Sequence, residues 1–193
     1  MKEISPPKIP IALGRSATIS IYVDADHAHC TLTRRSVAGI ILFVNGTPVK
    51  YSSKMMKTVE SATYGSELAA SRLAVDMAVE YRYTLRMLGV PINGPVRLYG
   101  DNNAVILNTT LPSSQLKKKH CAISYHRVRE AIAANIVQFF HVPSEENLAD
   151  ILTKPLTNDK FYNIAKFLVF RPVDYDIGEQ ASRANKVVTV LQK

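Results

Sequence analysis

The stretch Ile19-Ser20-Ile21-Tyr22-Val23-Asp24-Ala25-Asp26 decides the fold of this chain. Its aliphatic residues recur at every second position, a period that predicts a β-strand with one buried face. The strand ends in two carboxylates, Asp24 and Asp26. A lone aspartate at such a place is most often a turn or cap residue, but it also serves as a metal ligand at the rim of a sheet. The acidic residues farther along the chain decide between these interpretations.

The rest of the chain has the pattern of a sheet covered by helices. Two strands, at residues 37–44 and 48–53, are joined by the hairpin signal Asn45-Gly46 and are expected to flank the first strand as antiparallel neighbours. A helix opened by Ser144 as its N-cap is expected to continue to Leu152. The other predicted elements are one long helix or two tandem helices within 58–88, a strand at 96–100, a short helix at 102–108, a helix at 123–134, a strand at 136–142 and a helix at 158–170. This order predicts an α/β protein with a mixed sheet.

Length and composition limit the class of protein. With 193 residues, 47% of them hydrophobic, the chain can hold one domain and its extensions. We expect a soluble protein located inside the cell, in the cytoplasm or nucleus, because no apolar run is long enough for a membrane span and the first residues do not resemble a secretory signal. The net charge of +8 fits a polyanionic partner. Cys30 and Cys121 show neither a CxxC pair nor zinc spacing, so we expect reduced packing residues.

Four acidic residues lie where the predicted elements would bury them: Asp24 at the end of the first strand, Glu67 in the first turns of the long helix, Asp101 after the fourth strand and Asp150 in the helix after the last strand. If the first and fourth strands are parallel neighbours, Asp24 and Asp101 emerge at the same edge of the sheet. Carboxylates brought together repel one another unless divalent cations lie between them. Oxygen ligands favour Mg²⁺ or Mn²⁺, and two such ions support phosphodiester hydrolysis. Taken singly, each acid also has a structural explanation as a cap, turn or surface residue, and Asp26 is interpreted as a solvated neighbour.

Eight short segments then carry a family resemblance: 22–26, 33–39, 51–54, 63–67, 99–103, 119–120, 125–130 and 147–156. In this order they resemble the ribonuclease H domain at the carboxyl end of copia-type LTR retrotransposon Pol polyproteins, over about residues 19–157. The resemblance implies an α/β, ribonuclease H-like fold, with a five-stranded mixed sheet and helices on both faces. It also implies cutting of the RNA strand in RNA–DNA hybrids with two Mg²⁺ ions, or alternatively Mn²⁺.

The resemblance assigns roles to particular residues. Matched by motif, the catalytic and metal-binding acids are Asp24, Glu67, Asp101 and Asp150. Many ribonucleases H have a histidine in the loop before the last acid, whereas residues 143–148 contain none. His141, on the preceding strand, is interpreted as a packing residue. The missing histidine leaves the four metal-binding acids in place, but it bears on product release and on the rate of cleavage.

The resemblance also suggests an organisation for the chain and a nucleic-acid surface. Residues 1–17 form an extended lead-in, 18–157 the ribonuclease H-like domain, and 158–193 a C-terminal helix and polar tail. A hybrid of A-like form is recognised by its groove shape and 2′-hydroxyls. Candidate contacts to its phosphates and sugars are Arg34, Arg35, Ser53, Lys54, Lys117, Lys118, Lys119 and His120. For each of these residues an exposed, solubilising role is the alternative.

Three functions remain open at this point. The leading one is an endonuclease that degrades the RNA strand during reverse transcription, with the polymerase part of the reverse transcriptase as a partner. The alternative is a non-catalytic, domesticated module that binds nucleic acid or, through the tail at 174–193, a protein. In the third, the same two-metal site acts on DNA.

Overall fold

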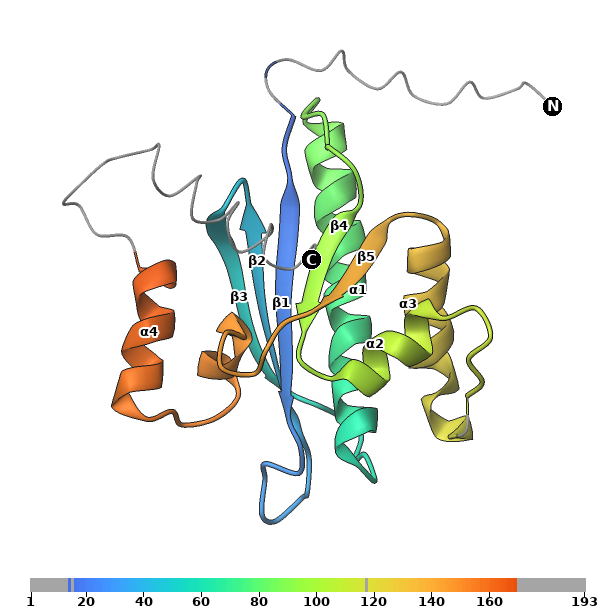
Figure 1. Ribbon diagram of the computed structural model, residues 1–193, viewed down its shortest axis with the longest axis vertical. Helices are drawn as coiled ribbons and strands as arrows, with labels where there is room; N and C mark the ends of the chain where they lie inside the picture. The colour runs from blue at the N-terminus through green and yellow to red at the C-terminus, as the bar shows by residue number, and fades with distance from the viewer. Residues whose placement is uncertain (1–13, 15, 117, 170–193) are drawn as a thin grey trace.

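A five-stranded sheet forms the centre of the computed structural model, which describes residues 14, 16–116 and 118–169 (Figure 1). The strands are β1 (Ile19–Asp26), β2 (Val37–Val44), β3 (Thr47–Met55), β4 (Val96–Gly100) and β5 (Val137–His141), in the spatial order β3-β2-β1-β4-β5. β2 runs antiparallel to β1 and β3, whereas β4 runs parallel to β1 and β5. The predicted mixed sheet is confirmed, and the parallel pairing of β1 with β4 meets the condition set for bringing Asp24 and Asp101 to one edge.

Helices lie on both faces of this sheet, as expected. Figure 1 shows α1 (Thr63–Met87), α2 (Asn103–Thr110) and α3 (Ala122–Ala133) gathered on one side, with α4 (Asn158–Leu168) on the other. Two 3₁₀ helices complete the fold: η1 (Lys119–Cys121) precedes α3, and η2 (Leu148–Leu152) packs on β1 and β2. The predicted region 58–88 therefore forms one helix, not two.

The alternation along β1 separates the core from the site. Ile19, Ile21 and Val23 are buried in one hydrophobic cluster with residues of α1 that include Leu68 and Val75. Burying such side chains stabilises the fold by about 1.5–3 kcal/mol each. The intervening residues of β1 point to the opposite face, because side chains alternate along a strand. One face of β1 thus anchors the sheet to α1, and the other carries Asp24 toward η2.

Two local predictions are wrong. β3 does not flank β1 but pairs only with β2, at the edge of the sheet, because β4 occupies the second side of β1. The helix expected from Ser144 is replaced by a turn followed by η2, whose N-cap is Asn147. The buried Asn147 amide donates to the carbonyl oxygen of Val23 at 3.0 Å, and its Oδ1 accepts from the backbone of Ala149 at 3.2 Å. This tie to β1 sets where the helix begins.

Other predictions concern the ends of the chain and its cysteines. Most of the lead-in at 1–17 and the tail at 170–193 lie outside the described residues, so the proposed division of the chain stays a prediction. Both cysteines are free; Cys121 is buried, and Cys30 is half-buried. Within the described ranges, no helix has both the length and the hydropathy to cross a bilayer.

Candidate active site

Three carboxylates converge at the edge where β1 and β4 end. Asp24 lies near the end of β1, Glu67 in the second turn of α1 and Asp101 directly after β4, and one oxygen from each lies within 4.8 Å of the others. Asp24 and Glu67 are only 2% and 6% exposed. Parallel strands bring their carboxyl ends to one edge, which explains how residues far apart in the sequence meet here.

The loop after β1 helps to place Glu67. His27 Nδ1 lies 2.8 Å from the Ser66 hydroxyl, and this hydroxyl lies 2.8 Å from that of Ser36. Ser36 also accepts a hydrogen bond from the backbone of Ala28 at 3.1 Å. These bonds fasten the first turns of α1 to the end of β1, so that the adjacent Glu67 side chain is held beside Asp24.

Burial makes the charged form of this cluster costly. Desolvation raises the pKa of Glu67 from 4.5 to about 9, and repulsion from Asp24 and Asp101 acts in the same direction. Desolvation likewise raises the pKa of Asp24 from 3.8 to about 7, although a hydrogen bond from Thr153 partly offsets it. Within residues 16–116 and 118–169, neither Glu67 nor Asp101 forms an ion pair. The cluster therefore favours a bound cation or bound protons.

Asp150 lies beside Asp24 but outside the group of three oxygens. It is fully buried in η2, and the ammonium of Lys154 lies 3.1 Å from its Oδ1 and 3.8 Å from Asp24 Oδ2. Lys160 of α4 forms an ion pair with its other oxygen. Burial acts to raise the pKa of Asp150, but hydrogen bonds from Lys160 and from its other neighbours hold it below the usual value. The fourth acid is thus already neutralised by lysines.

The position of η2 depends on a glycine. Gly39 of β2 pairs with Asp24, and a Cβ atom there would lie 2.6 Å from Thr153 Cγ2 and 2.8 Å from the carbonyl oxygen of Ala149. The absence of a side chain lets η2 approach the sheet closely. As a result, the Thr153 hydroxyl reaches Asp24 and donates a hydrogen bond to its Oδ2.

Asp101 is held by residues at the end of β5 and just after it. Ser144 Oγ donates to Asp101 Oδ2 at 2.7 Å, and His141 Nε2 lies 3.2 Å from the Asp101 carbonyl oxygen. Lys160, besides pairing with Asp150, donates to the Ser144 carbonyl at 2.8 Å. His141 is half-buried, and its polar contact places it next to the site rather than only in the packing.

Sequence reasoning missed four of these neighbours. Thr153 and Lys154 lie within the segment 147–156 that carries the family resemblance, so a signal for them was present. Ser144 was interpreted as a helix cap. Lys160 had no signal, because only the packing of α4 brings it to Asp150. Asp26, expected to be solvated, has its Oδ2 2.6 Å from His29 Nδ1 and remains partly exposed.

The candidate nucleic-acid residues lie in separate elements of the fold. Arg34 and Arg35 are exposed in the loop between β1 and β2, and Lys119 and His120 are exposed in η1. Lys118 is half-buried, and Lys117 lies outside the described residues. Ser53 donates to the carbonyl oxygen of Leu152 at 2.7 Å, a bond that fastens η2 to β3.

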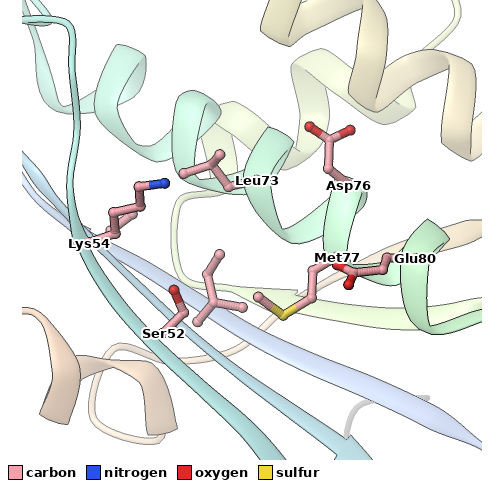
Figure 2. Close-up of a pocket in the computed structure, with 8 residues that line it drawn as sticks. Ser52, Lys54, Leu73, Asp76, Met77 and Glu80 are labelled. Carbon is pink, nitrogen blue, oxygen red and sulfur yellow. The ribbon is translucent and has the colours of Figure 1, made fainter.

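Lys54 faces a cavity on the opposite side of the sheet from η2. This cavity of about 210 Å³ is lined by Ala38, Ile40, Ser52, Lys54, Leu73, Asp76, Met77 and Glu80. Figure 2 shows the Lys54 side chain extending toward α1. Ser53 and Lys54 therefore lie on opposite faces of β3, as neighbours in a strand must.

Comparison with known proteins shows that the chain is similar in sequence to a segment of polyproteins from mobile elements. A segment of 156 residues is 29% identical to the retrovirus-related Pol polyprotein from transposon RE2 of Arabidopsis thaliana, and one of 155 residues is 30% identical to that from transposon RE1 of the same plant. Each match covers 79% of this chain and 10% of the polyprotein. The polyprotein from transposon TNT 1-94 of Nicotiana tabacum is 28% identical over 149 residues, 77% of this chain and 11% of that protein. The chain thus spans about a tenth of these relatives, and no family model matches it.

Solved structures agree on the fold. The N-terminal RNase H domain of Rv2228c from Mycobacterium tuberculosis, solved as a fusion with maltose-binding protein, has a TM-score of 0.55 at 16% identity, covering 78% of this chain and 98% of that one. LC11-RNase H1 in complex with an RNA/DNA hybrid has a TM-score of 0.55 at 16% identity, with 70% and 94% covered. The expected ribonuclease H-like fold and the resemblance to Pol polyproteins are confirmed.

Proposed function

Since the chain is a ribonuclease H-fold relative of retrotransposon Pol polyproteins, we propose that it is an endonuclease that hydrolyses the RNA strand of RNA–DNA hybrids. The observation that carries this proposal is the convergence of Asp24, Glu67 and Asp101 within 4.8 Å. Two of these carboxylates are buried, and the repulsion within the set destabilises the metal-free protein; a bound ligand accounts for such an arrangement.

The donor set suits a hard divalent cation. Asp24, Glu67 and Asp101 present only oxygen atoms, which Mg²⁺ and Mn²⁺ prefer, and Glu67 and Asp101 have no ion-pair partner within the described ranges. These three residues would hold the first ion. Asp150, next to Asp24, would contribute to a second one once Lys154 and Lys160 turn away. When bound, two such ions supply an activated water and stabilise the departing 3′ oxygen.

The surrounding residues orient these carboxylates. Thr153 donates to Asp24 and Ser144 donates to Asp101, so each aspartate keeps a defined rotamer. Nε2 of the half-buried His141 lies 3.2 Å from the carbonyl oxygen of Asp101, which makes its imidazole a candidate for proton transfer beside the site. Exposed Arg34, Arg35 and Lys119 are the candidates for phosphate contacts to the hybrid.

The other functions fit the site less well. A non-catalytic module has no use for three mutually repelling carboxylates, two of them buried, whose cost a bound cation offsets without the uptake of protons. A partnership with the polymerase part of a reverse transcriptase follows from the kind of relatives found, of which this chain spans about a tenth. A cytoplasmic or nuclear location stays a prediction from the sequence.

The proposed activity is tested by incubating the purified chain with an RNA–DNA hybrid labelled on either strand. With Mg²⁺ we expect internal cuts in the RNA strand only, none after chelation, and none with the Asp101→Asn variant. RNA and DNA duplexes of the same sequence serve as competing substrates. Binding of the hybrid without cleavage by the wild-type protein would support the module instead, and cleavage of the DNA duplex would support a DNA substrate.

The raised pKa values predict how pH and Mg²⁺ act on stability. The pKa of Asp24 rises from 3.8 to about 7 and that of Glu67 from 4.5 to about 9, so between these limits the folded state keeps protons that the unfolded state has lost. The free energy of unfolding of the metal-free protein therefore falls as the pH rises from about 5 to about 9. Because Mg²⁺ binds the deprotonated carboxylates, it should raise the melting temperature more near pH 9 than near pH 6.

Thermal unfolding monitored by circular dichroism at several pH values, with and without a few millimolar Mg²⁺, measures this effect. Ca²⁺-free buffers of constant ionic strength separate site binding from general screening. An equal effect of Mg²⁺ at both pH values would contradict the proposed cation site.

A further inference from the structure

A second group of potential metal ligands lies away from the three acids of the candidate active site. It consists of Glu60, in the segment before α1, together with His120 and Cys121 of η1. Glu60 Oε2 lies 3.5 Å from His120 Nε2 and 3.9 Å from Cys121 Sγ, and one ligand atom from each residue lies within 4.8 Å of the others. The sequence showed no zinc spacing, because Glu60 is far from the other two along the chain.

The surroundings of Glu60 leave its carboxylate short of positive charge. Its side chain is 12% exposed, and within residues 16–116 and 118–169 no lysine or arginine forms an ion pair with it; its neighbour is the imidazole of His120. Gly65 makes room for it, since a Cβ atom there would lie 2.5 Å from Glu60 Oε2. Desolvation first, and then the nearby Glu60 carboxylate, raise the pKa of the buried Cys121 thiol, so a thiolate would be disfavoured beside that carboxylate. A cation between them would remove that conflict.

The two separations measured from Glu60 are close to those in a tetrahedral transition-metal site. Metal bonds of about 2.3 Å to sulfur and about 2.0–2.1 Å to nitrogen or oxygen separate the ligands of such a site by about 3.4 Å for nitrogen and oxygen and about 3.6 Å for sulfur and oxygen. The observed separations of 3.5 and 3.9 Å are close to these values. We propose that Glu60, His120 and Cys121 bind a divalent transition-metal ion of the Zn²⁺ class, with water as the fourth ligand.

Binding requires no large rearrangement. Cys121 is 5% exposed and approaches from the interior, whereas the His120 side chain is 52% exposed and closes the site from solvent. The thiol loses its proton to solvent as the metal–sulfur bond forms, so metal binding releases one proton at this residue. The mixed thiolate, imidazole and carboxylate set distinguishes this site from the all-oxygen cluster, which favours Mg²⁺.

The bound ion would fasten the basic stretch at 118–120 to the start of α1. η1 and the segment before α1 are joined here by the side chains of Glu60, His120 and Cys121, and α1 carries Glu67 one turn farther on. The role is structural, and it holds or fails independently of the hydrolytic activity.

Co²⁺ titration of the metal-free, 193-residue chain tests the proposal in the presence of excess Mg²⁺, which occupies the carboxylate cluster. We expect one equivalent of Co²⁺ to bind at roughly micromolar concentration or below, with a thiolate-to-metal absorption band and the intense visible bands of tetrahedral Co²⁺. Added Zn²⁺ should abolish both the thiolate-to-metal band and the visible Co²⁺ bands. Cys121→Ser should remove the thiolate band, whereas Cys30→Ser, the matched control, should retain it.

His120→Ala provides a second variant at an exposed position, and we expect it to weaken Co²⁺ binding at least tenfold with an unchanged circular dichroism spectrum. The proposal is overturned if wild-type protein gives no thiolate band. A band that survives in Cys121→Ser or disappears in Cys30→Ser would overturn it as well.

Discussion

Replacing Glu67 by glutamine is expected to abolish hydrolysis of the RNA strand and, at the same time, to make the metal-free protein more stable. Glu67 contributes one of the three oxygens that lie within 4.8 Å of one another. Removing its charge takes away a cation ligand, and several kcal/mol of lost transition-state stabilisation correspond to a fall in rate of about a thousandfold or more.

The gain in stability has a separate origin. Burial and the neighbouring carboxylates raise the pKa of Glu67 from 4.5 to about 9, so folding at neutral pH requires this group to take up a proton. Because pH 7 lies well above the unperturbed pKa of 4.5, taking up this proton lowers the free energy of unfolding by about 3 kcal/mol. Glutamine is neutral and still accepts the hydrogen bond from the Ala25 backbone. The melting temperature of the metal-free variant should therefore rise by roughly 5–10 °C.

Both effects are measured on the same preparation, by hybrid cleavage with Mg²⁺ and by thermal unfolding with a chelator. Glu80→Gln, an exposed glutamate on the same helix, is the matched control and should change neither quantity appreciably. A Glu67→Gln protein that loses activity because it is less stable would contradict the electrostatic explanation, as would one that keeps its activity.

Replacing Gly39 by alanine is expected to displace η2 and to impair both stability and catalysis. The new Cβ atom would lie 2.6 Å from Thr153 Cγ2 and 2.8 Å from the backbone oxygen of Ala149. A backbone atom cannot move aside as a flexible side chain does, so η2 must shift away from the sheet. Overpacking of this kind costs about 1–3 kcal/mol. The shift also separates Thr153 from Asp24 and moves Asp150, which should lower the cleavage rate at saturating Mg²⁺.

Gly100→Ala is the control for this prediction. Gly100 ends β4, and a Cβ atom there would meet Phe139 Cε2 at 3.1 Å, a side-chain contact that can relax. We expect a smaller loss of stability and little change in rate. Chemical denaturation together with the hybrid assay compares the two variants. Equal effects of the two substitutions would show that the close approach of η2 to Gly39 is not what positions the site.

The elements with strong periodicity were predicted well. β1 and β2 have the expected residues, because alternating aliphatic side chains on a half-buried strand leave few other arrangements. The sequence pattern located α1 but did not decide between one long helix and two tandem helices. The turn after β5 was misread, since Ser144 and the following acids have the composition of a helix start and only the contact of Asn147 with Val23 moves that start.

By itself, the sequence determined which residues are acidic at the ends of buried elements, and hence which side chains can form a cation site. Only the tertiary structure decided their grouping: β1 pairs in parallel with β4 and brings Asp24, Glu67 and Asp101 together, whereas Asp150 lies against two lysines. The tertiary structure alone also places Glu60 next to His120 and Cys121. The reason is physical, because local patterns record whether a side chain is buried, while the distance between two buried groups depends on strand pairing and on how closely backbones can approach.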